Sequence, residues 1–179
     1  AKGPAMAPSQ ARKAISNGIE IVYDLCRNGT DIIITGEMGI GNTTTSAAIA
    51  SVILGIPAEI TTGRGAGLDS SGMSRKIAAI HRAIKLNKPD PTDPIDVLSK
   101  LGGFDIAGMT GLFLGGAECG IPIVIDGVIS AVSACLAEMI SPGCRDFMLP
   151  SHVSNEPSAR LLLEKLGLKA PINAGFHLG

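Results

Sequence analysis

The sequence has very few aromatic side chains and almost no excess charge. It holds no tryptophan, one tyrosine and four phenylalanines in 179 residues, and its formal net charge at pH 7 is −1. A protein that binds nucleic acid needs a basic surface for the phosphates or aromatic rings on which bases stack. The composition therefore argues against a nucleic-acid partner and favours small-molecule partners.

Long uninterrupted apolar runs are also missing. The longest apolar stretch, residues 106–125, contains Glu118, Pro122 and five glycines. We interpret it as a buried helix followed by a buried strand, with no membrane partner. The first residues, Ala1 to Met6, lack the apolar segment of a signal peptide and look like the middle of a longer protein.

The cysteines lack the spacing of metal ligands, and no two histidines and no carboxylate cluster have it either, so we predict no metal site. Each cysteine lies in or beside an apolar segment, which is typical of buried, reduced thiols in a cytoplasmic protein. The four cysteines are Cys26, Cys119, Cys135 and Cys144.

The chain does contain a regular alternation of helical patterns and short apolar strands. Hydrophobic residues make up 45% of it, enough to bury one full core. Strands are expected at residues 31–35, 121–125, 147–149 and 172–174, with helices between them. Helix boundaries are expected at Ser9 as a cap, Asn28-Gly29 as an end, Asp93-Pro94 as a start and Pro157 as a start. This alternation predicts an α/β fold, with a parallel sheet covered by helices on both faces.

The most informative segment runs from Gly36 to Thr45 and reads Gly-Glu-Met-Gly-Ile-Gly-Asn-Thr-Thr-Thr. It follows a predicted strand and precedes a predicted helix. Glycines let the backbone approach an anion closely, and a helix N-terminus supplies free N–H groups and a positive dipole end. The segment therefore predicts a phosphate cradle, the alternative being a tight turn that binds nothing. Glu37 places a carboxylate inside the turn, which favours a functional site over a turn that binds nothing.

Two common nucleotide motifs fit this cradle poorly. Gly36 and Gly41 have P-loop spacing and Thr43 takes the hydroxyl position, but Asn42 replaces the lysine that contacts the β- and γ-phosphates. Thr44 stands where a dinucleotide motif has its third glycine or alanine. A cradle for a single phosphate, as in a mononucleotide, needs neither feature.

Other loops carry further candidates. The loop from Gly63 to Gly67 offers backbone donors, including that of Gly65, and the cation Arg64, with Lys76 on the following helix. Each cation could instead be a solvated surface charge. Because ligands bind beyond the carboxyl ends of parallel strands, Asp126 and the segment 151–154 are expected to gather with the cradle at one edge of the sheet.

The polar residues at these strand ends allow two interpretations each. Asp126 could accept hydrogen bonds from ribose hydroxyls or only cap the next helix. Ser154 could hold phosphate or cap the helix that Pro157 opens, and sequence alone slightly favours the cap. His152 is a weak site candidate because it lies close to a strand end.

Five motifs together resemble one enzyme family, nicotinate-nucleotide:dimethylbenzimidazole phosphoribosyltransferase, over the whole chain. They are the segments 36–45, 63–69 (Gly-Arg-Gly-Ala-Gly-Leu-Asp), 101–108 (Leu-Gly-Gly-Phe-Asp-Ile-Ala-Gly), 125–127 (Ile-Asp-Gly) and 151–157 (Ser-His-Val-Ser-Asn-Glu-Pro). The resemblance implies a Rossmann-like, three-layer sheet in which residues 1–179 form the nucleotide-binding α/β core of a longer chain. It also implies a cytoplasmic homodimer.

The resemblance further implies a reaction without cofactor or metal. Nicotinate mononucleotide and 5,6-dimethylbenzimidazole, or a related azole base, would give α-ribazole 5′-phosphate, the lower-ligand precursor of cobalamin. Nicotinate leaves as a neutral pyridine, so no metal is needed to neutralise it. By motif match, Gly39, Gly41, Lys76 and Ser154 would hold the phosphate, Asp126 would lie near the ribose or nicotinate, and Glu37 would sit beside the reacting groups. Asn42, Thr43, Arg64 and Gly65 complete the set of expected substrate-binding residues.

The family's catalytic glutamate is expected one position after Gly179, in the continuation of residues 176–179. The 179 residues alone are therefore expected to be inactive or nearly so. A non-catalytic mononucleotide-binding module remains an alternative, and a P-loop-like phosphotransferase a less favoured one because of Asn42.

Overall fold

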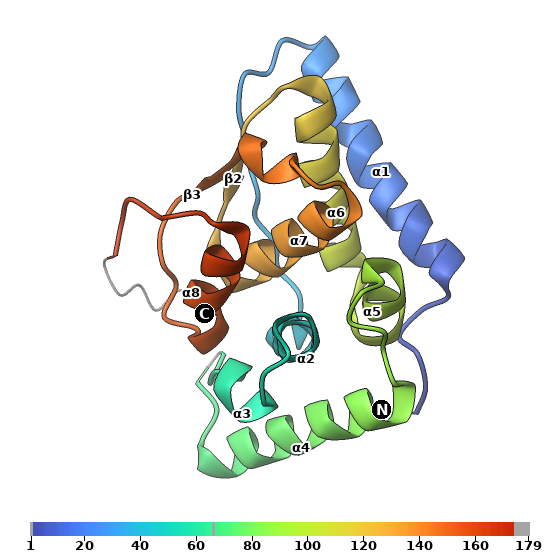
Figure 1. The fold of residues 1–179 in the computed structure, drawn as a ribbon, viewed down its shortest axis with the longest axis vertical. Coiled ribbons are helices and arrows are strands. Elements are labelled where there is room, and N and C mark those ends of the chain that lie inside the picture. The colour runs from blue at the N-terminus through green and yellow to red at the C-terminus, as the bar shows by residue number, and fades with distance from the viewer. Residues whose placement is uncertain (1, 66, 174–179) are drawn as a thin grey trace.

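A computed structural model describes residues 2–65 and 67–173 of the chain (Figure 1). Helices and short strands alternate along it, as the sequence predicts. The elements are α1 (Pro8–Arg27), β1 (Ile33–Ile34), α2 (Asn42–Leu54), α3 (Ala58–Thr61), α4 (Ser70–Asn87), α5 (Pro94–Leu101), α6 (Phe104–Cys119), β2 (Ile123–Ile125), α7 (Gly127–Ile140), the 3-10 helix η1 (Cys144–Phe147), β3 (Met148–Pro150) and α8 (Pro157–Leu166).

The three strands form a parallel sheet in the order β1-β2-β3, which confirms the predicted α/β class with a parallel sheet. In this register Ile33, Ile123 and Met148 lie side by side in one row, and Ile34, Val124 and Leu149 in the next. Because all strands run the same way, the loops that follow them start from one edge of the sheet.

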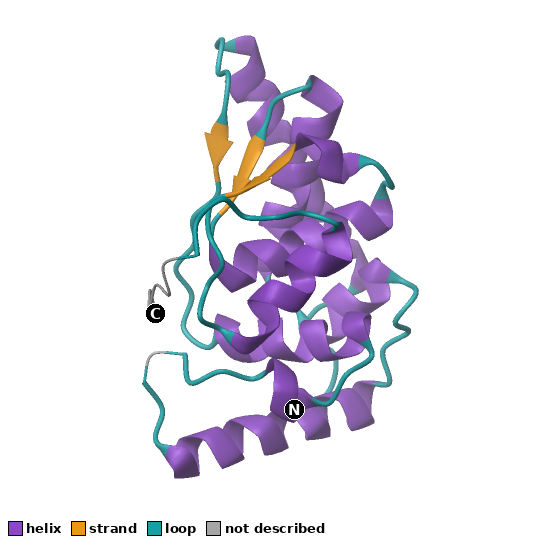
Figure 2. Cartoon of the chain, turned by 60° about the vertical axis from the view of Figure 1, so that its left-hand side comes forward, coloured by secondary structure: helices purple, strands orange, loops and turns teal. Residues whose placement is uncertain are grey.

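The two faces of this sheet differ in burial. The row of Ile33, Ile123 and Met148 faces α6 and α7 and belongs to the core or packs against it. The alternate row is open: Ile34 is 70% exposed and Leu149 47% exposed. Figure 2 shows the strands at the margin of the molecule, with the helices gathered to one side. Helices α6 and α7 thus lie against the first row, whereas the second row is exposed at its two outer strands.

The strands are also shorter than predicted. The predicted strand 31–35 is reduced to Ile33–Ile34. Pro122, directly before β2, has no N–H to donate to the residues that precede Ile33. The third strand begins at Met148 because η1 takes up Phe147. Of the predicted strand 172–174, Ile172 forms an isolated parallel bridge with His152, and Ala174 lies outside the described residues.

Helix ends follow local chemistry, with one correction. Ser9 lies inside α1 and is not its cap; Ala7 is, with Pro8 at the first helical position and the Gln10 side chain accepting a hydrogen bond from the Ala7 N–H at 2.9 Å. The predicted start at Asp93 is confirmed, since its carboxylate accepts hydrogen bonds from the N–H groups of residues 95 and 96.

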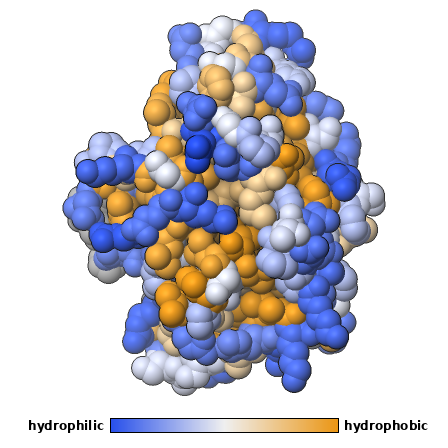
Figure 3. All heavy atoms as spheres, viewed as in Figure 1, coloured by the Kyte–Doolittle hydropathy of each residue, from blue (hydrophilic) through white to orange (hydrophobic). Residues whose placement is uncertain are grey.

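Helix α4 crosses the bottom of the view in Figure 1 and packs against α2, α3 and α5. Hydrophobic residues gather above it on the same face, between hydrophilic margins (Figure 3). No helix in the described part of the chain is long and apolar enough to cross a membrane. The four cysteines are free, and burial raises the pKa of Cys135 and of Cys144 to about 12.

Helices α1 and α6 approach each other unusually closely. A Cβ atom on Gly111 would lie 2.0 Å from the Ile15 carbonyl oxygen, and one on Gly18 would lie 2.1 Å from the Gly108 carbonyl oxygen. Such distances are possible only when neither glycine carries a side chain. The pair of glycines therefore sets the spacing of α1 against the core.

Candidate active site

The predicted loops meet around one cavity of about 690 Å³. The cradle, the start of α7, the segment before α8 and the described residues of the glycine loop (63–65 and 67) all contribute to its wall. Its lining includes the predicted residues Glu37, Thr43, Arg64, Gly65, Asp126 and Ser154. The sheet edge thus brings together segments that lie far apart in the sequence.

The cradle is anchored at its start by a buried hydroxyl. Thr35 Oγ1 donates to the Val124 carbonyl oxygen at 2.7 Å and lies 2.6 Å from Ser130 Oγ on α7. At the other end Gly41, with φ of 86°, caps α2 in the left-handed region that favours glycine. Between these two points the loop exposes the large apolar side chains of Met38 and Ile40.

Asn42, in the position of the missing P-loop lysine, is turned toward carboxylates. It is only 9% exposed, and its Nδ2 donates to Glu37 Oε2 and lies 3.4 Å from Asp105 Oδ2. Gly39 leaves room for this arrangement, because a Cβ there would lie 3.0 Å from Asp105 Oδ2. Asn42 therefore orients the Glu37 carboxylate, and the substrate contact expected of it stays a prediction.

The pKa of Glu37 is raised above its ordinary value. Desolvation is the largest cause, and the charges of Asp105 and Asp126 add to it, while the hydrogen bond from Asn42 acts in the opposite direction. A carboxylate with a raised pKa and nearby negative charges strongly attracts a positive charge or a proton.

Two substitutions should move the pKa of Glu37 in opposite directions. Asn42→Ala removes the donor and should raise it further, whereas Asp105→Asn removes a neighbouring charge and should lower it. Titration of the Glu37 carboxyl carbon by NMR measures both changes. Shifts of the same sign in the two variants would contradict the hydrogen-bond geometry described above.

Lys76, on the second turn of α4, is not a lining residue of the cavity but lies directly behind two residues of its wall, Thr43 and Gly63. It is 7% exposed, and its Nζ donates to Thr43 Oγ1 at 3.0 Å and to the Gly63 carbonyl oxygen at 2.9 Å. The cation missing from the loop is thus supplied beside the cradle by another helix. Burial lowers the pKa of Lys76, and the charge of Glu156 partly offsets this effect. The alternative of a solvated surface charge is wrong for Lys76.

Arg64, the other candidate cation, is exposed, and its Nη1 donates to the Leu68 carbonyl oxygen at 2.6 Å. The Gly65 N–H, expected to bind an anion from outside, donates to Glu156 Oε1 at 3.1 Å. The described part of the glycine loop is therefore held by the protein's own carboxylate.

The capping alternatives for Asp126 and Ser154 are both wrong. Asp126 precedes α7, but its side chain makes no capping hydrogen bond. Its Oδ1 lies 3.7 Å from His152 Nδ1, and about half of the Asp126 side chain is exposed. Glu156, not Ser154, is the N-cap residue of α8; Ser154 Oγ accepts a hydrogen bond from the Glu156 N–H at 3.3 Å. Both side chains line the cavity.

Sequence reasoning missed three features of this site. It gave no role to Glu156 or Asp105, and it did not pair His152 with Asp126. Each feature joins residues from different elements of the fold, and no local pattern encodes such a pairing. The available signal was the placement of Asp105 inside the motif of residues 101–108 and of Glu156 inside that of residues 151–157.

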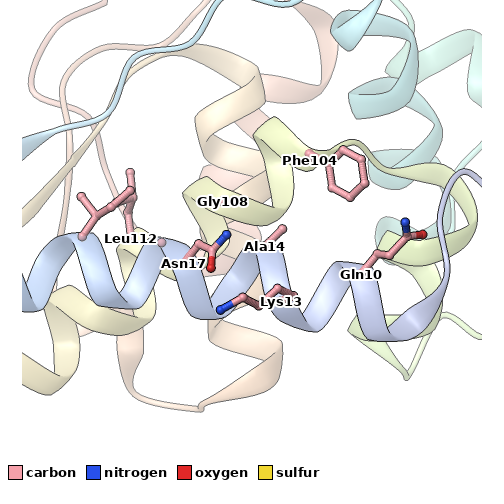
Figure 4. A pocket seen from close by; sticks show the side chains of 9 residues that line it. Gln10, Lys13, Ala14, Asn17, Phe104, Gly108 and Leu112 are labelled. Atoms are coloured by element: carbon pink, nitrogen blue, oxygen red, sulfur yellow. The ribbon is translucent and has the colours of Figure 1, made fainter.

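A second cavity of about 420 Å³ lies between α1 and α6 and shares no lining residue with the first (Figure 4). Lys13, Asn17 and Phe104 are among the side chains that line it. In the described part of the chain, no group of three or more histidine, cysteine, aspartate or glutamate side chains is arranged to hold a metal ion.

The parallel sheet, with a glycine-rich cradle and a buried lysine where its strands end, places the chain in the α/β class. Within that class, the chain belongs to the phosphoribosyltransferase family DBI_PRT, whose family model matches residues 1–179.

Relatives agree with this assignment. The chain is 50% identical over 179 residues to the nicotinate-nucleotide–dimethylbenzimidazole phosphoribosyltransferase of Acetivibrio thermocellus, and 48% identical to that of Desulforudis audaxviator. It covers 51% of each of these proteins and is itself matched completely. A crystal structure described as CobT from Thermus thermophilus superposes with a TM-score of 0.92 at 38% identity, over 99% of this chain and 53% of that one. The chain thus spans about half the length of its relatives.

Proposed function

We propose that the protein transfers the phosphoribosyl group of nicotinate mononucleotide to 5,6-dimethylbenzimidazole, giving α-ribazole 5′-phosphate and nicotinate for the lower ligand of cobalamin. The observation that carries the proposal is a cavity whose wall holds a carboxylate of raised pKa, Glu37, and two residues, Thr43 and Gly63, that accept hydrogen bonds from the buried Lys76 ammonium. The names of the relatives supply the substrates. We also propose that the protein is a homodimer located in the cytoplasm.

In this proposal the phosphate binds at Lys76 and the cradle, with Ser154 within the same cavity. The Asp126 carboxylate accepts hydrogen bonds from the ribose hydroxyls. A benzimidazole nitrogen attacks C1′ on the face opposite nicotinate, the C1′–N bond to nicotinate breaks, and its electron pair leaves with the pyridine ring. Positive charge grows on the ribose as this bond loosens, and the Glu37 carboxylate stabilises it. The resemblance assigns the base that takes the benzimidazole proton to a glutamate after position 179.

The orientation of Asn42 supports this reaction over phosphotransfer from a nucleoside triphosphate. A P-loop uses its own lysine and a hydroxyl-bound Mg²⁺ to hold the β- and γ-phosphates. Here the equivalent side chain donates to Glu37, and the buried cation beside Thr43 comes from α4. One buried lysine beside the loop is enough to bind a single phosphate group.

Thermal protection tests the proposal. Nicotinate mononucleotide should raise the melting temperature equally with and without EDTA, and Mg·ATP should change it little. A site filled at a hundred times its dissociation constant adds about 2.7 kcal/mol to the free energy of unfolding. For a chain of this size, that corresponds to a rise of roughly 5 to 10 °C.

Nicotinate riboside serves as the control ligand, because it lacks only the phosphate. A rise produced by Mg·ATP and abolished by EDTA, with no effect of nicotinate mononucleotide, would overturn the proposed function.

A further inference from the structure

Lys76 is a buried charge whose hydrogen-bond acceptors are neutral. Its ammonium donates to a threonine hydroxyl and to the Gly63 carbonyl, and neither acceptor carries a compensating charge. An ammonium ion loses much of its hydration on burial and needs a nearby anion to stay protonated. The anion whose charge acts on Lys76 is Glu156, at the start of α8.

Other charged groups near α4 are engaged elsewhere. Asp69 caps α4 through the Gly72 N–H, and Arg64 donates to the Leu68 carbonyl. Glu59 on α3 pairs with His81 at 2.7 Å, on the exposed part of α4. Glu37 and Asp126, the other carboxylates of the cavity wall, contact Asn42 and His152. Glu156 is the carboxylate whose charge acts on Lys76.

Glu156 also fixes the backbone that holds Lys76. Its Oε1 accepts a hydrogen bond from the Gly65 N–H at 3.1 Å, and its carboxylate lies so close to Gly63 that a Cβ there would be 1.9 Å from Oε2. Gly63 and Gly65 are the residues whose backbone surrounds the ammonium: one supplies the acceptor carbonyl, and a Cβ on the other would lie 3.5 Å from Lys76 Nζ.

We propose that Glu156 is a positioning residue for the phosphate site, acting as the counter-ion of Lys76 and as the clamp on the glycine loop at Gly63 and Gly65. The inference rests on the proposed function, in which Lys76 receives the phosphate of nicotinate mononucleotide. Glu156 itself need not touch the ligand, because it acts through the charge and the position of Lys76.

Two variants separate the effect of the negative charge of Glu156 from the effect of its hydrogen bond with the Gly65 N–H. Glu156→Gln keeps an oxygen that accepts the Gly65 hydrogen bond but removes the charge. Glu156→Ala removes both. In Glu156→Gln the pKa of Lys76 should fall below its wild-type value, because the favourable charge is gone while burial remains. NMR titration of the Lys76 ammonium, in the absence of ligand, measures this change.

Binding of nicotinate mononucleotide should follow the same logic. In Glu156→Gln, affinity at pH 7 should stay within about threefold of wild type, and its loss at alkaline pH should begin at lower pH. In Glu156→Ala, affinity at pH 7 should fall by about tenfold, the effect of losing roughly one hydrogen-bonded contact. Calorimetry across pH measures both profiles, and Glu164→Gln, an exposed position on the same helix, is the matched control.

The two proposals fail in different ways. If wild-type protein does not bind nicotinate mononucleotide, the proposed function fails, while the Lys76 titration still tests Glu156. An unchanged Lys76 pKa in Glu156→Gln would overturn the counter-ion role. Tighter binding in both Glu156 variants would show instead that the carboxylate competes with phosphate, and would also overturn the inference.

Discussion

Replacing Lys76 by alanine should weaken the binding of nicotinate mononucleotide by about tenfold to a hundredfold, while the affinity for nicotinate riboside stays nearly constant. A hydrogen bond to a charged group contributes roughly 1.5 to 3 kcal/mol, and Lys76 is the buried cation beside the cradle. Isothermal titration calorimetry with the two ligands measures the difference directly.

The pH dependence of this affinity has a defined sign. Burial lowers the pKa of Lys76, so the ammonium loses its proton at lower pH than an ordinary lysine, and phosphate affinity should decline as pH rises through that lowered value. The matched control is Lys85→Ala, since Lys85 is exposed on the same helix. Equal losses for both ligands in Lys76→Ala would contradict a phosphate-specific role.

The second large effect concerns stability. Gly111→Ala should lower the free energy of unfolding by about 3 kcal/mol, the upper part of the range for an overpacked core, because the new methyl group would meet the Ile15 carbonyl oxygen at 2.0 Å. Both clashing partners belong to helix backbones, so α1 must move away from α6. The melting temperature should fall by roughly 6 to 12 °C.

Gly108→Ala on the same helix is the control, because a Cβ there would have no heavy atom within 4 Å. Alanine favours a helix interior over glycine by up to about 1 kcal/mol, so this variant should be unchanged or slightly stabilised. Equal destabilisation of both variants would show that Gly111 does not set the helix spacing.

The sequence predicted best what short-range chemistry controls. The cradle, the end of α1 at Asn28-Gly29 and the start of α5 at Asp93 depend on glycine conformations and caps that a few neighbouring residues determine. The gathering of strand ends also followed, because it is a property of any parallel sheet. The choice of Ser9 as a cap failed for a local reason, since Pro8 already fits the first position of the helix.

The contacts that orient the side chains of the site could not be predicted from short segments of the sequence. The contact of Asn42 with Asp105 spans 63 positions, and that of Gly65 with Glu156 spans 91. Each depends on how α6 or α8 packs against the rest of the fold. The composition could indicate a buried sheet, but it could not indicate that Ile34 and Leu149 on its second row are exposed.

The open row of Ile34, Val124 and Leu149 also bears on how the protein behaves in concentrated solution. A net charge of −1 gives molecules little mutual repulsion at neutral pH, so an apolar sheet face in water meets other copies with almost no electrostatic barrier. Association through this face is then expected to limit the concentration at which the protein stays dispersed. Buffers that move the net charge away from zero, rather than conditions that stabilise the fold, are the ones that should keep the protein dispersed.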